Sequence, residues 1–130
     1  MQNAPMAKEA IIAVVDDDEA VRLGLSSLLR SLGYVVMTFA SGQDFLRSPH
    51  RGDVSCLVSD IQIPGMSGLE LHDRLVATNT PIPTILITGY PDNEARKHAL
   101  DAGVLCYLKK PLVYDELLAC IKTTLSQHGA

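Results

Sequence analysis

The sequence lacks any apolar run long enough to cross a membrane. Its longest such run covers only residues 10–15, whereas a membrane-spanning helix needs roughly 18 or more apolar residues. The opening residues MQNAPMAKEA also lack the apolar centre of a signal peptide. These absences argue against a membrane protein and predict a protein of the cytoplasm with no membrane partner.

Cysteine and positive charge are also scarce. The three cysteines form no C-x-x-C pair, so neither a disulfide framework nor a zinc site is indicated. A net charge of −4 provides no basic surface for nucleic acid, and we expect no direct nucleic-acid binding by this domain. The four histidines show no ligand spacing and are expected on the surface: His50, His72, His98 and His128.

The length and composition predict one domain. At 130 residues, with 47% hydrophobic side chains, the chain falls within the roughly 100 to 200 residues of a domain that buries its own core. No repeat, low-complexity stretch or interdomain linker interrupts it. We interpret residues 1–10 as a flexible N-terminal tail and residues 11–128 as the domain.

Short β-rich runs alternate with segments of helical periodicity, a pattern typical of a parallel sheet covered by helices on both faces. The clearest helix spans residues 19–32, because its apolar residues recur at helical spacing and Gly33 follows where a C-terminal cap belongs. The predicted strands are 11–15, 34–39, 56–59, 84–87 and 106–109. The other predicted helices are 41–47, with Ser41 and Asp44 spaced as in a capping box, and 67–77, 92–102 and 113–127.

Five parallel strands with right-handed crossovers admit the flavodoxin-like order 2-1-3-4-5, a single doubly wound α/β sheet. In that order the first and third strands are neighbours, and ligands bind beyond the carboxyl ends of the strands. Each of four predicted strands ends at polar side chains. These side chains should therefore form one pocket: Asp16, Asp17, Asp60, Thr88 and Lys110.

Three carboxylates placed together repel one another, so the pocket requires a proton or a cation. Magnesium suits such a site, because it binds a few carboxylates together with waters and phosphate oxygens. An aspartate can attack phosphorus and form an acyl phosphate when nearby positive charge neutralises the phosphoryl oxygens. Lys110 could supply that charge and Thr88 a hydrogen bond, while Gly89 has no side chain to block a phosphodonor.

Four stretches in this order resemble the receiver domain of bacterial two-component response regulators: VVDDDEAVR, LVSDIQIPGMSGLEL, ILITGY and LKKP. The resemblance extends from about residue 11 to residue 127. It implies that Asp60 is the phosphoacceptor and that Thr88 and Lys110 contact the phosphoryl oxygens. It also implies a site for Mg²⁺, or for Mn²⁺, made by Asp16, Asp17, Asp60 and the backbone carbonyl of Gln62.

The same resemblance implies a switch and partners. In the family, phosphorylation draws the hydroxyl at the position of Thr88 inward, and an aromatic side chain, here Tyr107, fills the vacated space. The face made by the fourth helix, fifth strand and fifth helix then changes shape, and a homodimer could form through that face. The phosphodonor is expected to be a sensor histidine kinase or a phosphotransfer protein, and the chain is expected to act as a switch without turning over a metabolite.

Several positions depart from the common pattern of the family. Two lysines precede Pro111, and Lys110 is chosen because it immediately precedes the proline; strand alternation would send Lys109 the other way. Leu112 replaces a frequent phenylalanine. Gln62 and Tyr90, each two residues after a site residue, occupy positions where the family tunes the lifetime of the phosphoryl group.

Other interpretations stay open for single residues and for the whole chain. The acids before the first helix are often a plain helix cap, and Tyr107 on its own fits a strand aromatic that only packs its ring. A magnesium-dependent phosphohydrolase has the same ingredients, although no second acid follows Asp60 at Gln62. A receiver that never carries phosphate is a further alternative. The chain could also be the receiver of a longer regulator with a LuxR-type DNA-binding domain, or of a hybrid kinase.

Overall fold

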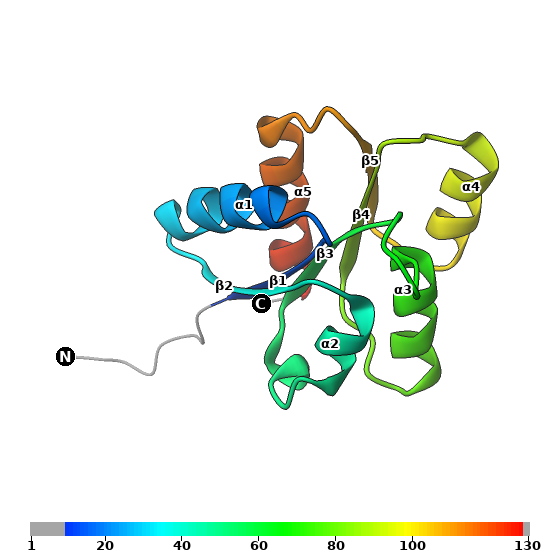
Figure 1. The fold of residues 1–130 in the computed structure, drawn as a ribbon, viewed down its shortest axis with the longest axis horizontal. Helices are drawn as coiled ribbons and strands as arrows, with labels where there is room; N and C mark the ends of the chain where they lie inside the picture. Colours follow the sequence, from blue (N-terminus) through cyan, green and yellow to red (C-terminus); the bar gives the residue numbers. More distant parts are fainter. Residues whose placement is uncertain (1–9, 129–130) are drawn as a thin grey trace.

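The computed structural model describes residues 10–128, in which five strands alternate with five helices and one short 3₁₀ helix (Figure 1). The predicted tail at residues 1–10 lies outside the described residues except for Ala10. The strands are β1 (Ile11–Val15), β2 (Val35–Phe39), β3 (Cys56–Asp60), β4 (Thr84–Thr88) and β5 (Cys106–Lys109). The helices are α1 (Glu19–Ser31), α2 (Gly42–Arg47), α3 (Gly68–Ala77), α4 (Asn93–Asp101) and α5 (Tyr114–His128), with η1 at Arg51–Asp53.

The strands form one parallel sheet in the order β2-β1-β3-β4-β5, which confirms the predicted flavodoxin-like architecture. Helices cover both faces of this sheet: α1 and α5 lie on one side, and α2, α3 and α4 lie on the other (Figure 1). β1 and β3 are buried over nearly their whole length, and β1 and the first three residues of β3 are accordingly all apolar, as is typical of parallel strands covered on both faces.

Two apolar layers hold the helices to the sheet. On the first face, Leu25 and Leu29 of α1 pack with Leu117 and Ile121 of α5 over the central strands. On the second face, the buried groups come from α2, α3 and α4, and they include Phe45, Leu71, Leu75 and Ala99. Burial of side chains on both faces fixes the position of the strand ends, where the candidate site lies.

Local signals start and stop the helices. Asp18 caps α1 by accepting hydrogen bonds from two backbone amides of its first turn, and Gly33 follows the helix with φ +94°, a conformation that glycine adopts without strain. Ser67 and Glu70 form a complete capping box at α3. At α2 only half of the predicted box is found, because the Ser41 side chain accepts a bond from the Asp44 amide.

The prediction that the histidines lie on the surface is wrong for His72, which is 5% exposed. His50 and His98 are exposed, while the side chain of His128 lies outside the described residues. His72 stands one residue after Leu71 and three before Leu75, two side chains that are fully buried, so it belongs to the inner face of α3. Spacing on the helix thus outweighed the usual preference of histidine for the surface.

Of the helices within residues 10–128, none combines the length and the apolar character that crossing a membrane requires. The predicted cytoplasmic location stays a prediction. The cysteines are free thiols; Cys56 is buried, and Cys106 and Cys120 are half-buried. Burial raises the pKa of both Cys56 and Cys106 to about 12, so these two sulfurs remain protonated at neutral pH.

Candidate functional site

The polar side chains singled out in the sequence lie along one edge of the sheet. Asp16 directly follows β1, Asp60 and Thr88 are the last residues of β3 and β4, and Lys110 directly follows β5. These four strands are consecutive neighbours and run parallel. Their carboxyl ends therefore bring the four side chains to the same rim, where ligands bind in open α/β sheets.

The closest contact in the site joins Asp60 and Lys110. The Lys110 Nζ donates to Asp60 Oδ2 at 2.5 Å, while Asp60 is only 5% exposed. Its other oxygen, Oδ1, accepts a hydrogen bond of 2.8 Å from the Gln62 amide. The bond to Asp60 is the main reason that the pKa of Lys110 is raised, so the ammonium keeps its charge. Lys109 is exposed.

Asp16 adds a second buried carboxylate. It is 4% exposed, and its Oδ1 accepts a 2.8 Å hydrogen bond from the Asp18 amide. Burial raises the pKa of Asp16; the charges of Asp60 and Asp17 raise it further, while the Asp18 amide and Lys110 lower it. Negative charge at this site is thus only partly compensated by the protein. Asp17, one residue along, is exposed.

Arg22 anchors the turn that carries these acids. Its Nη1 donates a 2.6 Å hydrogen bond to the carbonyl oxygen of Asp16, and the Asp16 amide donates to the Phe39 carbonyl at the end of β2. The turn is therefore tied both to α1 and to the sheet. Both hydrogen bonds engage the backbone of Asp16, so they hold the turn in place without neutralising its carboxylate.

Gln62 makes a side-chain contact with the end of β4 that the sequence did not predict. Its Oε1 accepts a 3.0 Å hydrogen bond from the Thr88 hydroxyl and a 3.4 Å bond from the Gly89 amide. The Thr88 oxygen accepts in turn from the Tyr90 amide at 3.0 Å. Gln62 thus links the loop after β3 to the end of β4. The available signal was a long polar side chain two residues after the acid, at a position that the family resemblance connects with the lifetime of the phosphoryl group.

Gly68 was also absent from the predicted site residues, since the sequence placed it only within the predicted helix 67–77. A Cβ built on Gly68 would lie 2.5 Å from the carbonyl oxygen of Asp60 and 3.0 Å from Ser59 Oγ. A side chain at this position would displace the backbone that carries the acid. The start of α3 can approach the end of β3 this closely only because residue 68 has no side chain.

Tyr107 is half-buried on β5 and packs against the cluster of Leu86, Ala99 and Val104. In the pairing of β4 with β5, Tyr107 lies opposite Leu86 and Lys109 lies opposite Thr88. Because side chains alternate along a strand, Tyr107 and Thr88 face the same side of the sheet. This is the side that α4 covers.

The donor atoms at the rim suit a divalent metal ion. Among residues 10–128 no three His, Cys, Asp or Glu side chains are placed to hold a metal ion as they stand. Two buried carboxylates of which only one is paired with a cation, together with the exposed Asp17, nevertheless form an all-oxygen donor set that suits Mg²⁺ or Mn²⁺. Mg²⁺ usually takes only one or two carboxylates and fills its remaining positions with water and phosphate.

A groove of about 370 Å³ opens beside the acids, lined by Asp16, Lys110 and apolar side chains of α1 and of the segment after β5.

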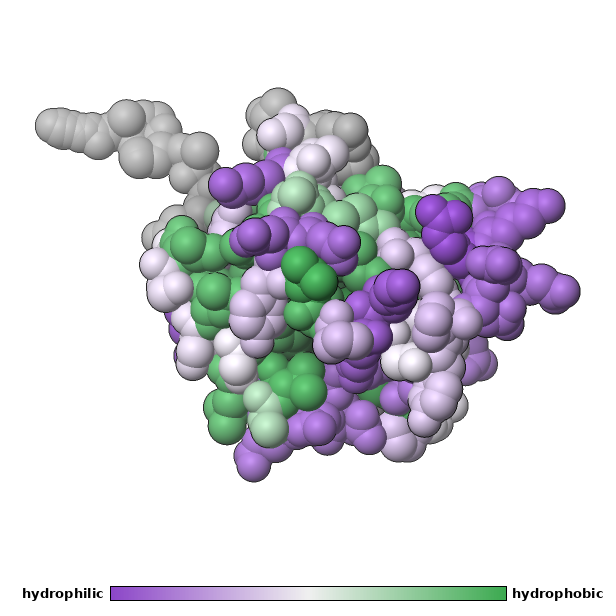
Figure 2. All heavy atoms as spheres, turned by 90° about the horizontal axis from the view of Figure 1, so that it is seen from above, coloured by the Kyte–Doolittle hydropathy of each residue, from purple (hydrophilic) through white to green (hydrophobic). Residues whose placement is uncertain are grey.

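Hydrophilic side chains gather on another flank of the molecule, over the region of α4 (Figure 2). The only buried residue of α4 is Ala99. α4 therefore rests on the sheet through a small apolar contact.

Comparisons with known proteins agree with this geometry. A family model described as "Response regulator receiver domain" matches residues 12–122. The response regulator protein TmoT of Ectopseudomonas mendocina is 38% identical over 118 residues, which is 91% of this chain and 54% of the relative. The transcriptional regulatory protein FixJ of Bradyrhizobium diazoefficiens is 36% identical over 122 residues, which is 94% of this chain and 60% of that protein.

Solved structures give the same result. The response regulator StyR matches with a TM-score of 0.85 and 39% identity over 93% of this chain and 61% of that one. FixJ-N matches with a TM-score of 0.79 and 32% identity over 90% of this chain and 94% of that one. The chain spans 54% of TmoT and 60% of FixJ. With the family model covering most of its length, this chain belongs to the response regulator receiver domain family.

Proposed function

We propose that the domain accepts a phosphoryl group on the carboxylate of Asp60 from a phosphohistidine of a sensor histidine kinase or a phosphotransfer protein. The observation that carries this proposal is the 2.5 Å contact of the Lys110 ammonium with a carboxylate that is otherwise buried at a strand end. A carboxylate held in this way is oriented as a nucleophile, with a cation beside the place where phosphoryl oxygens would lie.

In the transfer, an oxygen of Asp60 forms a bond to phosphorus while the bond from phosphorus to the donor nitrogen breaks. The electron pair leaves with the imidazole, and the product is an acyl phosphate. Lys110 shifts its hydrogen bond from the carboxylate to a phosphoryl oxygen and remains charged. When bound, Mg²⁺ would be held by Asp16, Asp17, Asp60 and the Gln62 carbonyl, and it would supply positive charge against the phosphoryl oxygens.

Thr88 connects this chemistry to a change of shape. Its hydroxyl is engaged by Gln62, and a phosphoryl oxygen would compete for the same donor. When Thr88 turns to the phosphoryl group, space opens on the face that it shares with Tyr107. The face of α4, β5 and α5 then shifts toward a second conformation. The size of this shift is set by how much more favourably the phosphoryl group interacts with the second conformation than with the first.

The groove beside Asp16 and Lys110 is the proposed approach for the donor protein. Exposed apolar side chains lie at its edge: Tyr114, which lines the groove, and the neighbouring Val113. A helix that carries a phosphohistidine could cover these groups and deliver phosphorus to the strand ends. Exposed apolar groups around a polar centre are typical of a protein interaction site.

The output is proposed from the relatives. FixJ is named a transcriptional regulatory protein, and this chain covers only part of its length. We infer that the domain serves as the receiver of a longer regulator and that it pairs with a second copy through α4, β5 and α5. In this role it is a switch that catalyses only its own phosphorylation and dephosphorylation.

The test is intact-mass analysis after incubation with acetyl phosphate and Mg²⁺. The wild type and the exposed control Asp53→Asn should gain the mass of one phosphoryl group, and both should lose this gain when Mg²⁺ is chelated. Asp60→Asn should gain none. Equal labelling of Asp60→Asn would refute the assignment, and multiple turnover on small phosphate esters would indicate a phosphohydrolase instead.

A further inference from the structure

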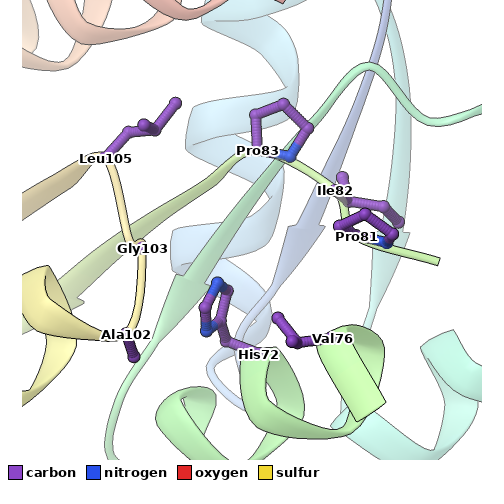
Figure 3. Close-up of a pocket in the computed structure, with 8 residues that line it drawn as sticks. All are labelled: His72, Val76, Pro81, Ile82, Pro83, Ala102, Gly103 and Leu105. Carbon is purple, nitrogen blue, oxygen red and sulfur yellow. The ribbon is translucent and has the colours of Figure 1, made fainter. Parts of the chain in front are cut away.

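Charged side chains are distributed unequally between two hollows of the molecule. A pocket of about 310 Å³ lies between α3, the segment that leads into β4 and the turn between α4 and β5 (Figure 3). Apart from His72 it is lined by apolar residues such as Val76 and Leu105, so its walls offer no carboxylate to a cation. The groove at the strand ends, in contrast, is lined by Asp16 and Lys110. The residues that hold this rim in shape are therefore the ones that can influence a bound cation.

Arg22 is a cation that stands close to several acids without pairing with any of them. It is half-buried near the start of α1, a few residues after the acidic run 16–19. Within the part of the chain that the structure describes, it forms no salt bridge. Its Nη1 donates instead to the carbonyl oxygen of Asp16 at 2.6 Å. The guanidinium thus leaves the neighbouring carboxylates free and engages the backbone between them.

The carbonyl of Asp16 belongs to the peptide group that joins Asp16 to Asp17, two of the proposed ligands of the cation. A peptide group is planar, so a bond that fixes its oxygen also fixes the direction in which the chain continues into Asp17. The carboxylate of Asp16 is held separately, because its Oδ1 accepts from the Asp18 amide. Arg22 therefore controls how the side chain of Asp17 is directed relative to that of Asp16.

Two effects of Arg22 on a bound cation have opposite signs. Its charge repels a cation, but salt screens this repulsion over a Debye length of about 8 Å. Its hydrogen bond orients the ligands in advance, and loss of an outer-shell partner of a metal site typically lowers metal affinity by roughly 10- to 100-fold. The orienting effect should therefore outweigh the repulsion.

We infer that Arg22 is a positioning residue for the divalent cation, because it holds the peptide group between Asp16 and Asp17 so that both carboxylates can serve one ion. This inference rests on the cation site of the proposed function. It adds to that site a residue that does not touch the ion and that acts only through the backbone of its ligands.

The experiment measures binding of Mn²⁺ to the full chain from the EPR signal of the free ion, with no phosphodonor present. Arg22→Met removes both the charge and the hydrogen-bond donor and keeps an unbranched side chain. It should weaken Mn²⁺ binding roughly 10-fold, the lower end of the range for an outer-shell partner. Loss of the positive charge alone would strengthen binding, so unchanged or tighter binding would overturn the inference.

Arg30 provides the matched control. It lies on the same helix, and its Nη2 donates to the carbonyl oxygen of Val36 at 3.2 Å, again six residues away in the sequence. The helix separates it from Arg22 by about 12 Å, which exceeds the Debye length of about 8 Å. Arg30→Met should leave Mn²⁺ binding unchanged, although it loses the same kind of bond. Equal weakening in both variants would indicate a general loosening of α1 and would overturn the inference.

Asp17→Asn separates failure of this inference from failure of the proposed function. If wild type and Asp17→Asn bind Mn²⁺ equally well, the cation site itself is refuted. If Asp17→Asn weakens binding and Arg22→Met does not, only the role of Arg22 is refuted. Should Arg22→Met not fold, the guanidinium ¹⁵N signals of the wild type decide: two resolved Nη signals in the presence of Mg²⁺ support the held guanidinium, and one averaged signal overturns the inference.

Discussion

Replacing Gly68 by alanine tests how tightly α3 is packed against the acid that we propose as phosphoacceptor. The added Cβ would meet the Asp60 carbonyl oxygen at 2.5 Å, Ser59 Oγ at 3.0 Å and Leu86 Cδ2 at 3.1 Å. The first of these neighbours is backbone and cannot rotate away. Forcing an extra methyl group into such a site costs about 1–3 kcal/mol, so Gly68→Ala should lower the free energy of unfolding by that amount.

Gly24 provides the matched control. It lies within α1 and is exposed, and a Cβ there would meet nothing within 4 Å. Alanine is favoured over glycine inside a helix by about 0.5–1 kcal/mol. The same chemical change should therefore stabilise the protein at position 24 and destabilise it at position 68.

Urea unfolding followed by circular dichroism measures both effects. With a slope of about 2 kcal/mol per M of urea, a cost of about 2 kcal/mol moves the midpoint down by about 1 M. Gly68→Ala should also slow labelling of Asp60 by acetyl phosphate, because the displaced carbonyl belongs to that residue. A midpoint that rises for Gly68→Ala as it does for Gly24→Ala would refute the close approach of α3 to β3.

Three further substitutions address the site and the buried histidine. Lys110→Gln keeps length and polarity but removes the charge beside Asp60, so the rate of labelling by acetyl phosphate, followed by intact mass, should fall roughly 100-fold; an unchanged rate would exclude Lys110 from the chemistry. Gln62→Ala removes the acceptor of the Thr88 hydroxyl, so the Thr88 methyl signal in NMR should show exchange between rotamers before phosphorylation, and a single fixed rotamer would contradict the role of Gln62. Burial lowers the pKa of His72 below its ordinary value of 6.5, so the unfolded chain binds the proton more readily, and the wild type should lose stability as the pH falls through about 6.5. His72→Leu should lack that part of the decline in urea unfolding at pH 7.5 and pH 5.5, and parallel curves for the two proteins would show that the imidazole is not buried in solution.

The fold could be predicted because its signals are local. Apolar runs that end in charged or hydroxyl side chains located the strands within one residue at each end, and Gly33 marked a helix end that has positive φ in the structure. General rules of chain crossover admit the strand order 2-1-3-4-5 but do not single it out, so this order was taken from the known flavodoxin-like fold. The placement of Asp16, Asp60, Thr88 and Lys110 on one rim followed from that order.

The parts that could not be predicted depend on the direction of side chains and on close approach. Gln62 is an exposed loop residue, and no periodicity indicates that its amide turns toward Thr88 instead of solvent. The need for glycine at position 68 arises from a contact between α3 and β3 that only the folded chain creates. His72 was predictable in principle, because it shares the spacing of Leu71 and Leu75, but the preference of histidine for the surface was given more weight than its place on the helix.

The sequence left open whether the acids after β1 only cap the first helix or hold a metal ion, and the structure of this turn separates the two interpretations. Asp18 caps α1, since its side chain accepts from the amides of Ala20 and Val21, and Asp16 is held by the Asp18 amide. The Asp17 side chain accepts no hydrogen bond among residues 10–128, so capping the helix does not explain why an acid stands at this position.

If Asp17 helps to bind a cation, Asp17→Asn should raise the Mg²⁺ concentration needed for half-maximal labelling of Asp60 and leave urea unfolding nearly unchanged. Asp18→Asn should do little to either, because asparagine also caps helices, whereas Asp18→Ala should cost about 1 kcal/mol of stability. An unchanged Mg²⁺ requirement in Asp17→Asn would leave Asp17 as a solvated surface charge.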